Sequence, residues 1–184
     1  MNLKDSVEEK IKVWQADEKE KAQYLAVKKV FELFPKNDNL VEVLIKVSVI
    51  DDFYATNLYG TYTMAKHIVD LKIDEKLSKN DLSVVSDIAN IRVKDKVRNN
   101  YSFATKYCSH HNEEFYPIYD QYVDKSLCFF RKKDNFCDFK NDDLKKYEKF
   151  KSVIQEFSEK YELTDYSVRD IDKFLWLFGK GGCK

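Results

Sequence analysis

The chain has 184 residues, of which 43% are hydrophobic, and its 32 basic and 32 acidic residues give zero formal net charge. A chain of this length and apolar content can bury most of the surface that it exposes when unfolded, which excludes global disorder. The balanced charge excludes a protein that coats nucleic acid by bulk charge, but it is compatible with a local basic patch.

Two long helices are predicted in the N-terminal third. Residues 6–34 carry two capping-box patterns, which indicate either two helices or one helix broken near Ala16. Pro35 follows and ends this helical segment. Residues 39–54 are the most apolar segment, with apolar side chains on nearly every face of a helix, and they are predicted to form a buried central helix.

Shorter elements are predicted in the middle of the chain. Residues 61–71 have apolar positions at helical spacing, and residues 72–80 are expected to be a connector. Asp81 is expected to cap a short helix that runs through Ile91. The basic stretch that follows, over residues 93–100, has no predicted regular structure.

The remaining segments also have the periodicity of helices. Helices are predicted over residues 101–111, 118–130 and 142–161, and from Ser167 to a stop at Gly179. The sequence therefore predicts an all-α fold with roughly eight to ten helices. We expect a single domain over residues 1–184, in which residues 1–36 form a helical extension and residues 38–180 form the core.

The sequence shows no membrane, metal or cofactor signal. Its N-terminal segment lacks the apolar stretch of a signal peptide, and no run of about 18 apolar residues occurs. The four cysteines are spaced too irregularly for a zinc or iron–sulfur site. We therefore expect a cytoplasmic, monomeric protein without a membrane partner, a metal or a cofactor.

Chemistry-bearing residues concentrate in residues 99–124. A predicted helix carries Lys106, a loop that ends at Pro117 follows, and the next helix carries Asp120 in its first turn. A helix–loop–helix corner could bring the lysine and the aspartate together. This pair could be a reaction centre or an ordinary ion pair.

Two stretches of this segment resemble a known family. Residues 102–112, SFATKYCSHHN, and residues 116–123, YPIYDQYV, are similar to the segment of the helix–hairpin–helix DNA glycosylases that holds the catalytic lysine and aspartate. The resemblance is strongest to the 8-oxoguanine glycosylase group, in which a small residue stands two positions before the lysine and a P-x-x-D pattern begins the next helix. Residues 47–57 and 169–180 also resemble segments of this fold. The resemblance spans residues 38–180 and implies a compact multi-helix domain of the helix–hairpin–helix glycosylase type.

The resemblance implies a DNA glycosylase/AP lyase of base excision repair that acts on double-stranded DNA with one nucleotide flipped out. Lys106 would be the nucleophile that forms a Schiff base, and Asp120 would be its carboxylate partner. The implied base pocket comprises Phe103, His110, His111, Tyr116, Tyr119, Asp51, Asp52 and Asn57. The implied phosphate contacts are Arg92, Lys94, Lys96 and Arg98.

Other interpretations remain open at this point. Lys106 could be an ordinary surface lysine, and Asp120 could be only an N-cap. The protein could be a catalytically silent nucleic-acid-binding or adaptor protein of the same fold, which the zero net charge and the lack of glycine in residues 98–102 favour. A third possibility is a metal-dependent phosphodiester hydrolase that pairs one of the two histidines with Asp51 or Asp52.

Overall fold

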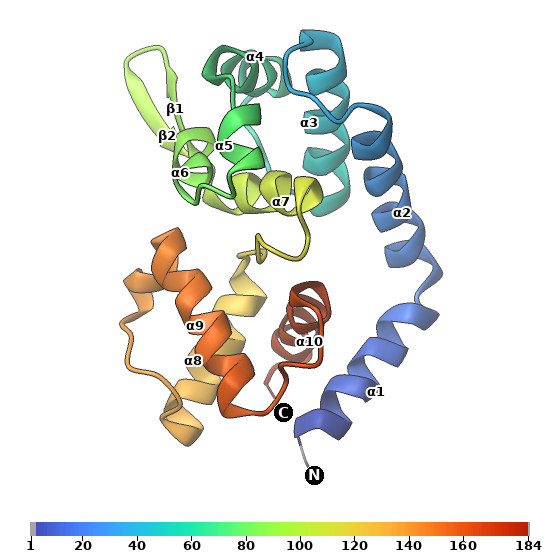
Figure 1. Ribbon diagram of the computed structural model, residues 1–184, viewed down its shortest axis with the longest axis vertical. Helices are drawn as coiled ribbons and strands as arrows, with labels where there is room; N and C mark the ends of the chain where they lie inside the picture. The colour runs from blue at the N-terminus through green and yellow to red at the C-terminus, as the bar shows by residue number, and fades with distance from the viewer. Residues whose placement is uncertain (1–2, 184) are drawn as a thin grey trace. The chain divides into compact units, whose positions relative to one another are not determined.

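The computed structural model describes residues 3–183, and within that range it contains ten α-helices, one 3-10 helix and one two-stranded hairpin (Figure 1). The predicted all-α fold class is confirmed, because helices dominate the chain. Two compact units are present. Residues 22–115 form one, which we call the central unit, and residues 1–21 with 116–184 form the other, the terminal unit. The expected single domain over residues 1–184, with its extension and core, stays a prediction.

The central unit begins within α2 (Glu18–Leu33) and contains five further helices. These are α3 (Leu40–Tyr54), α4 (Thr61–Leu71), α5 (Asp74–Ser78), α6 (Ser83–Ala89) and α7 (Tyr101–His111). Helix α3 packs against α4 and α7, and α6 packs against α7. The core between these helices is aliphatic and includes Val43, Val47, Ile50, Met64, Ile68, Val84 and Ile88. The bounds of α4 and α7 are those predicted, and the expected connector over residues 72–80 contains the short helix α5.

Helix α3 is less buried than its composition suggests. Asn39 caps it, because its side chain accepts hydrogen bonds from two backbone amides of the first turn. Val43, Val47 and Ile50 face the core, but Val41 is 68% exposed. The predicted burial therefore holds for the face that carries Val43, Val47 and Ile50, whereas Val41 lies on an apolar side that faces outward.

The basic stretch forms a β-hairpin, for which no regular structure was predicted. Strand β1 (Asn90–Val93) pairs antiparallel with β2 (Lys96–Asn99), and the pairs include Ile91 with Arg98 and Arg92 with Val97. A two-residue turn joins the strands, and its first residue, Lys94, has a φ of +54°. Glycine or asparagine is usual at such a position, so the usual sequence signal of a hairpin is absent.

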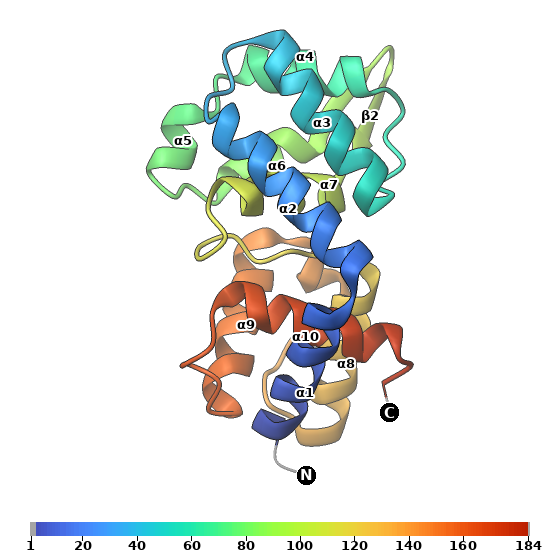
Figure 2. The same ribbon diagram turned by 90° about the vertical axis from the view of Figure 1, so that its right-hand side faces the viewer.

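The terminal unit is built around aromatic side chains. Its helices are α1 (Leu3–Ala16), α8 (Gln121–Asp134), the 3-10 helix η1 (Asn141–Lys145), α9 (Tyr147–Lys160) and α10 (Val168–Lys180). Helix α10 packs against α8 and α1, and Figure 2 shows α10 beside these two helices. The ring of Phe130 lies 5.1 Å from that of Phe157 and 4.9 Å from that of Phe178, measured between centroids. The break predicted near Ala16 is confirmed, since α1 ends there.

The sequence predicted that the last helix stops at Gly179, but in the structure Gly179 lies within the helix. Helix α10 continues to Lys180, and Gly179 is buried against α8. A Cβ atom at this position would lie 2.2 Å from the carbonyl oxygen of Tyr122 and 2.8 Å from the hydroxyl of Ser126. Glycine is therefore needed here for the close approach of two helices rather than for a turn.

Candidate nucleic-acid interface

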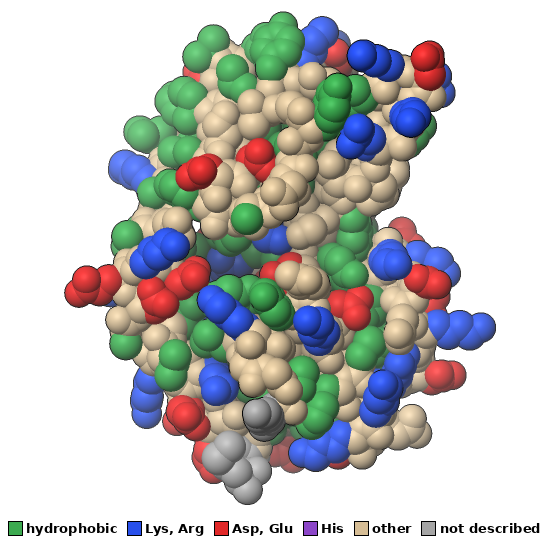
Figure 3. All heavy atoms as spheres, turned by 180° about the vertical axis from the view of Figure 1, so that it is seen from behind, with side chains coloured by type: hydrophobic (Ala, Val, Ile, Leu, Met, Phe, Trp, Pro, Cys, Tyr) green, Lys and Arg blue, Asp and Glu red, His purple; other side chains and the backbone are tan. Residues whose placement is uncertain are grey.

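The hairpin carries four basic side chains at the surface of the central unit. Arg92, Lys94, Lys96 and Arg98 are all exposed, and Asp95 is the single carboxylate of the hairpin. Figure 3 shows Lys and Arg side chains gathered over this corner of the molecule, at the upper right of the view. The pleat of the strands divides these cations, because directly paired residues share a face. Arg98 is paired with buried Ile91, whereas Arg92 is paired with exposed Val97 and points the other way.

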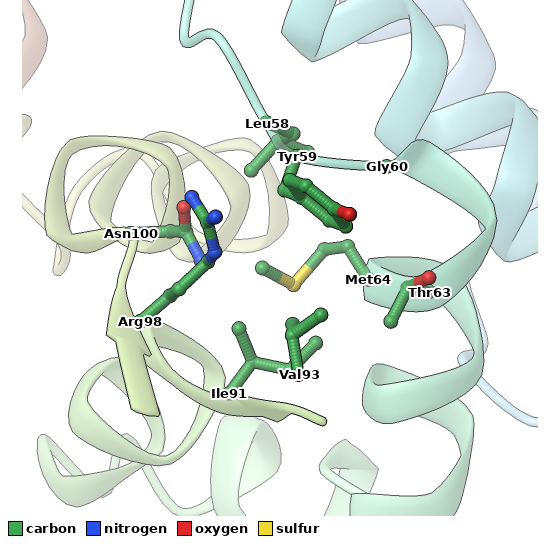
Figure 4. Close-up of a pocket in the computed structure, with 9 residues that line it drawn as sticks. All are labelled: Leu58, Tyr59, Gly60, Thr63, Met64, Ile91, Val93, Arg98 and Asn100. Atoms are coloured by element: carbon green, nitrogen blue, oxygen red, sulfur yellow. The ribbon is translucent and has the colours of Figure 1, made fainter. Parts of the chain in front are cut away.

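Arg98 stacks on an exposed tyrosine. Its guanidinium carbon lies 4.3 Å from the centroid of the Tyr59 ring, and Tyr59 is 60% exposed. A narrow pocket lies beneath the ring, lined by Leu58, Tyr59, Gly60, Thr63, Met64, Ile91, Val93, Arg98 and Asn100. Figure 4 shows Arg98 beside the Tyr59 ring, with the side chains of Met64 and Ile91 facing the space under it. The hairpin and the loop after α3 thus form one continuous surface.

Asp51 shapes the loop that presents Tyr59. Its carboxylate accepts a hydrogen bond of 2.6 Å from the hydroxyl of Thr56 and one of 3.0 Å from the backbone amide of Leu58. Ala55 and Asn57 adopt left-handed backbone conformations, which turn the chain sharply between these bonds. Of the residues implied for the base pocket, Asp51 therefore supports this loop, whereas Asp52 and Asn57 are exposed.

Lys106 is a buried lysine within the central unit. It is only 4% exposed, its ammonium donates a hydrogen bond of 2.6 Å to the hydroxyl of Ser102, and it lies 5.7 Å from the centroid of the Tyr54 ring. The interpretation of Lys106 as an ordinary surface lysine is therefore wrong. Phe103 on the same helix is also buried and packs toward the ring of Tyr107.

Asp120 belongs to the terminal unit and caps α8. One of its oxygens accepts hydrogen bonds from the backbone amides of Tyr122, at 2.8 Å, and Val123, at 3.0 Å. This confirms the capping interpretation and leaves the catalytic role of the Lys106 and Asp120 pair a prediction. Tyr116 is fully buried in this unit. Tyr119 donates to Asp124, and burial with this carboxylate raises its pKa.

The two adjacent histidines take part in separate networks of the central unit. The Nε2 atom of His110 lies 2.9 Å from the hydroxyl of Tyr54. Close to His110, Glu113 accepts a hydrogen bond of 2.7 Å from the hydroxyl of Tyr24. His111 instead lies 3.2 Å from the side-chain oxygen of Asn37. Burial, together with a nearby lysine, lowers the pKa of His111 to about 3, so its imidazole is neutral at physiological pH.

Asn37 is the centre of a buried polar network that sequence reasoning missed. Its side-chain oxygen accepts hydrogen bonds from Lys46, at 2.7 Å, and from the hydroxyl of Tyr107, at 2.5 Å. Its amide nitrogen donates to Asp74 at 2.6 Å. Burial lowers the pKa of Lys46 to about 8, and nearby carboxylates oppose this shift. A signal was present, because Lys46 is the single cation within the apolar run of α3.

The rest of the described chain offers no other obvious centre. Among residues 3–183, no group of three or more His, Cys, Asp or Glu side chains is placed to hold a metal ion. The four cysteines are free. None of the described helices combines the length and the apolar character that crossing a bilayer requires.

The fold and this surface define a mainly helical protein with a basic hairpin and an exposed tyrosine. Residues 6–115 match the family model HI_0787_N: N-terminal domain, and the chain belongs to this family. A Haemophilus influenzae (strain Rd) relative, named only as an uncharacterized protein, is 39% identical over 150 residues, which cover 80% of this chain and 72% of the relative. No solved structure matches the chain. The family match ends at residue 115, where the central unit also ends.

Proposed function

We propose that this protein binds nucleic acid through the β1–β2 hairpin, with double-stranded DNA as a partner. The observation that carries the proposal is the set of four exposed cations, accompanied by one carboxylate, on a chain whose net charge is zero. A local excess of Lys and Arg supplies the electrostatic attraction for phosphates that the chain as a whole lacks.

The division of the cations between two faces suits contact with the sugar–phosphate backbone of nucleic acid. Arg92 lies on the outer face of the hairpin, and Arg98 lies beside Tyr59 on the face that packs against the unit, and because both side chains are exposed, each can contact a phosphate. A two-stranded ribbon is also narrow enough to enter the major groove of duplex DNA. Contacts of this kind position a protein on nucleic acid without selecting its sequence.

Salt-dependent binding to a labelled DNA duplex tests this proposal. A variant that carries glutamate at Arg92, Lys94, Lys96 and Arg98 is expected to lose most of its affinity, and the slope of log K against log salt should fall by about one for each phosphate contact removed. A matched control carries the same four charge reversals at Lys29, Lys66, Lys72 and Lys79, which are exposed positions elsewhere in the central unit. Equal losses in the two variants would contradict a role for the hairpin.

A second candidate function, a DNA glycosylase/AP lyase of the helix–hairpin–helix type, is favoured by Lys106. This lysine is buried on the helix that directly follows the basic hairpin, and a hydroxyl holds its amine. In this proposal the unprotonated amine attacks C1′ of a flipped nucleotide, and the base leaves with the electrons of the broken glycosidic bond. The attacking nitrogen then gives up a proton, which the departing base can take, and the sugar ring opens by cleavage of the C1′–O4′ bond to leave an iminium, which is the Schiff base. The Asp120 carboxylate would stabilise the positive charge that develops on the sugar.

Borohydride trapping on lesion-bearing duplex DNA tests the second candidate independently of binding. The wild-type protein should give a covalent adduct, and Lys106→Gln should abolish it, whereas exposed Lys66→Gln should not. Absence of an adduct with every common lesion, together with retained DNA binding, would rule out the lyase and leave the binding function standing.

A further inference from the structure

We infer that Tyr59 and Arg98 form a stacking platform for an unpaired base, so that single-stranded nucleic acid is a ligand of the hairpin surface. This inference rests on the proposed binding function and adds single strands to the ligands of the same surface. Exposed rings next to cations recur in proteins that bind single strands, because every base has a face that can stack.

The geometry leaves space for a nucleotide outside the ring but not beneath it. The pocket under Tyr59 has a volume of about 10 Å³, which is close to the room that one water molecule needs. The space on the hairpin side is about 250 Å³ and is lined by Tyr59, Val93, Lys94, Asp95, Lys96 and Arg98. The space outside the ring can therefore receive part of a nucleotide, such as its base, whereas the pocket beneath the ring cannot.

Different residues around this space can contact the base and the phosphates of a nucleotide. Tyr59 and the guanidinium of Arg98 present flat surfaces on which a base can stack. Lys94 and Lys96 are exposed at the turn of the same hairpin and can pair with the adjoining phosphates. Base and phosphate contacts therefore come from one continuous surface.

The platform is ordered before any ligand arrives. Arg98, which also lines the pocket beneath the ring, makes a cation–π contact with Tyr59, and Asp51 fixes the preceding loop through Thr56 and Leu58. A ring held in place loses little conformational entropy on binding, which increases its contribution to affinity. Tyr62 is 58% exposed in the same unit but lines neither of these spaces, so it offers a matched control.

Fluorescence anisotropy with three labelled strands of equal length tests the inference. The strands are oligothymidylate, oligouridylate and an abasic deoxyribose strand, all with the same number of phosphates. Tyr59→Ala should weaken binding to either base-bearing strand by about 5- to 150-fold, should leave the abasic strand unaffected, and should make the three affinities alike. Tyr59→Phe should retain binding, and Tyr62→Ala should have no effect. Tyr59 is exposed, so a thermal melt of each variant checks that the fold persists.

The outcomes separate this inference from the proposed function. Absence of salt-sensitive binding to every single strand, with binding to the labelled duplex retained, would overturn the platform alone, whereas absence of binding to the duplex as well would overturn both. Salt-sensitive binding that is equal for base-bearing and abasic strands, or equal losses in Tyr59→Ala and Tyr62→Ala, would overturn the platform alone. Tighter binding to either base-bearing strand than to the abasic strand, lost in Tyr59→Ala, supports the platform whichever sugar is preferred, since the ring contacts the base.

Discussion

The ammonium of Lys46 donates a hydrogen bond of 2.7 Å to the side-chain oxygen of Asn37, and neither side chain is more than 1% exposed. Lys46 also donates to the carbonyl of Lys36 at 2.7 Å. A lysine without access to water costs stability unless its donors are satisfied. These two hydrogen bonds satisfy the ammonium and connect the turn before α3 to the core of the central unit.

Asn37→Ala should destabilise the protein severely. The substitution leaves the buried donors of Lys46, Tyr107 and His111 without their common acceptor, and each such loss costs about 1–3 kcal/mol. We expect the free energy of unfolding, measured by urea titration, to fall by at least about 3 kcal/mol. Gln155→Ala, at an exposed position of α9, is the control and should change it by less than about 0.5 kcal/mol. Similar values for the two variants would show that the network contributes little.

His111 should make the protein sensitive to acid. Its folded pKa is about 3, below the 6.5 of an unfolded chain, so the unfolded state takes up a proton first as the pH falls. The resulting stability is present above pH 6.5 and is lost progressively toward pH 3, by up to about 5 kcal/mol.

His111→Gln retains a side-chain donor for Asn37 but cannot titrate. The free energy of unfolding, measured from pH 7 to pH 4, should therefore fall less steeply in this variant than in the wild type. The difference between the two slopes should correspond to at most about one bound proton. Identical slopes would mean that the imidazole gains a proton equally in the folded and unfolded states.

Gly179→Ala should push α8 and α10 apart. The added methyl would overlap the carbonyl oxygen of Tyr122, which belongs to a helix backbone and cannot rotate away. Overpacking of this kind costs about 1–3 kcal/mol, and we expect at least the upper end of that range. Gly60→Ala is the control, since its new methyl would meet only the hydroxyl of Thr63, at 3.5 Å. Thermal denaturation compares the two, and equal melting temperatures would show that the helices can adjust.

Asp120 allows its capping role to be measured apart from any catalytic one. Asp120→Ala should destabilise the protein by about 1 kcal/mol, because two amides of the first turn of α8 lose their acceptor. Asp120→Ser retains a capping oxygen and should restore most of that stability. If borohydride trapping detects an adduct, Asp120→Ser should still impair its formation, since a hydroxyl carries no charge. Full adduct formation in Asp120→Ser would confine this residue to capping.

Helix positions were predictable where the signal is local. Asn39 and Ser167, at which two of the predicted helices begin, cap α3 and α10, and a cap depends only on amides two or three residues away. The start of α8 was placed three residues early, since the helix was expected to follow Pro117 directly but begins only after its N-cap, Asp120. Helix α9 was likewise predicted as part of one longer helix that includes η1.

The surface and buried networks were not predictable in this way. The hairpin has strands of four residues, and Lys94 occupies the turn position where glycine is expected. Asn37 draws its partners from positions 46, 74, 107 and 111, so only the assembled fold brings them together. The candidate cations were found from composition, whereas Tyr59 was missed because its contact with Arg98 joins residues 39 positions apart.

The hydrogen bonds from Thr56 and Leu58 to Asp51 have a consequence for the history of the family. A relative that replaces this carboxylate with a side chain lacking an acceptor would release the loop that carries position 59. Selection for an aromatic at position 59 would then weaken, because a mobile ring serves poorly as a surface for bases. Aligned sequences should therefore show correlated substitution at positions 51 and 59, even though these two side chains need never touch.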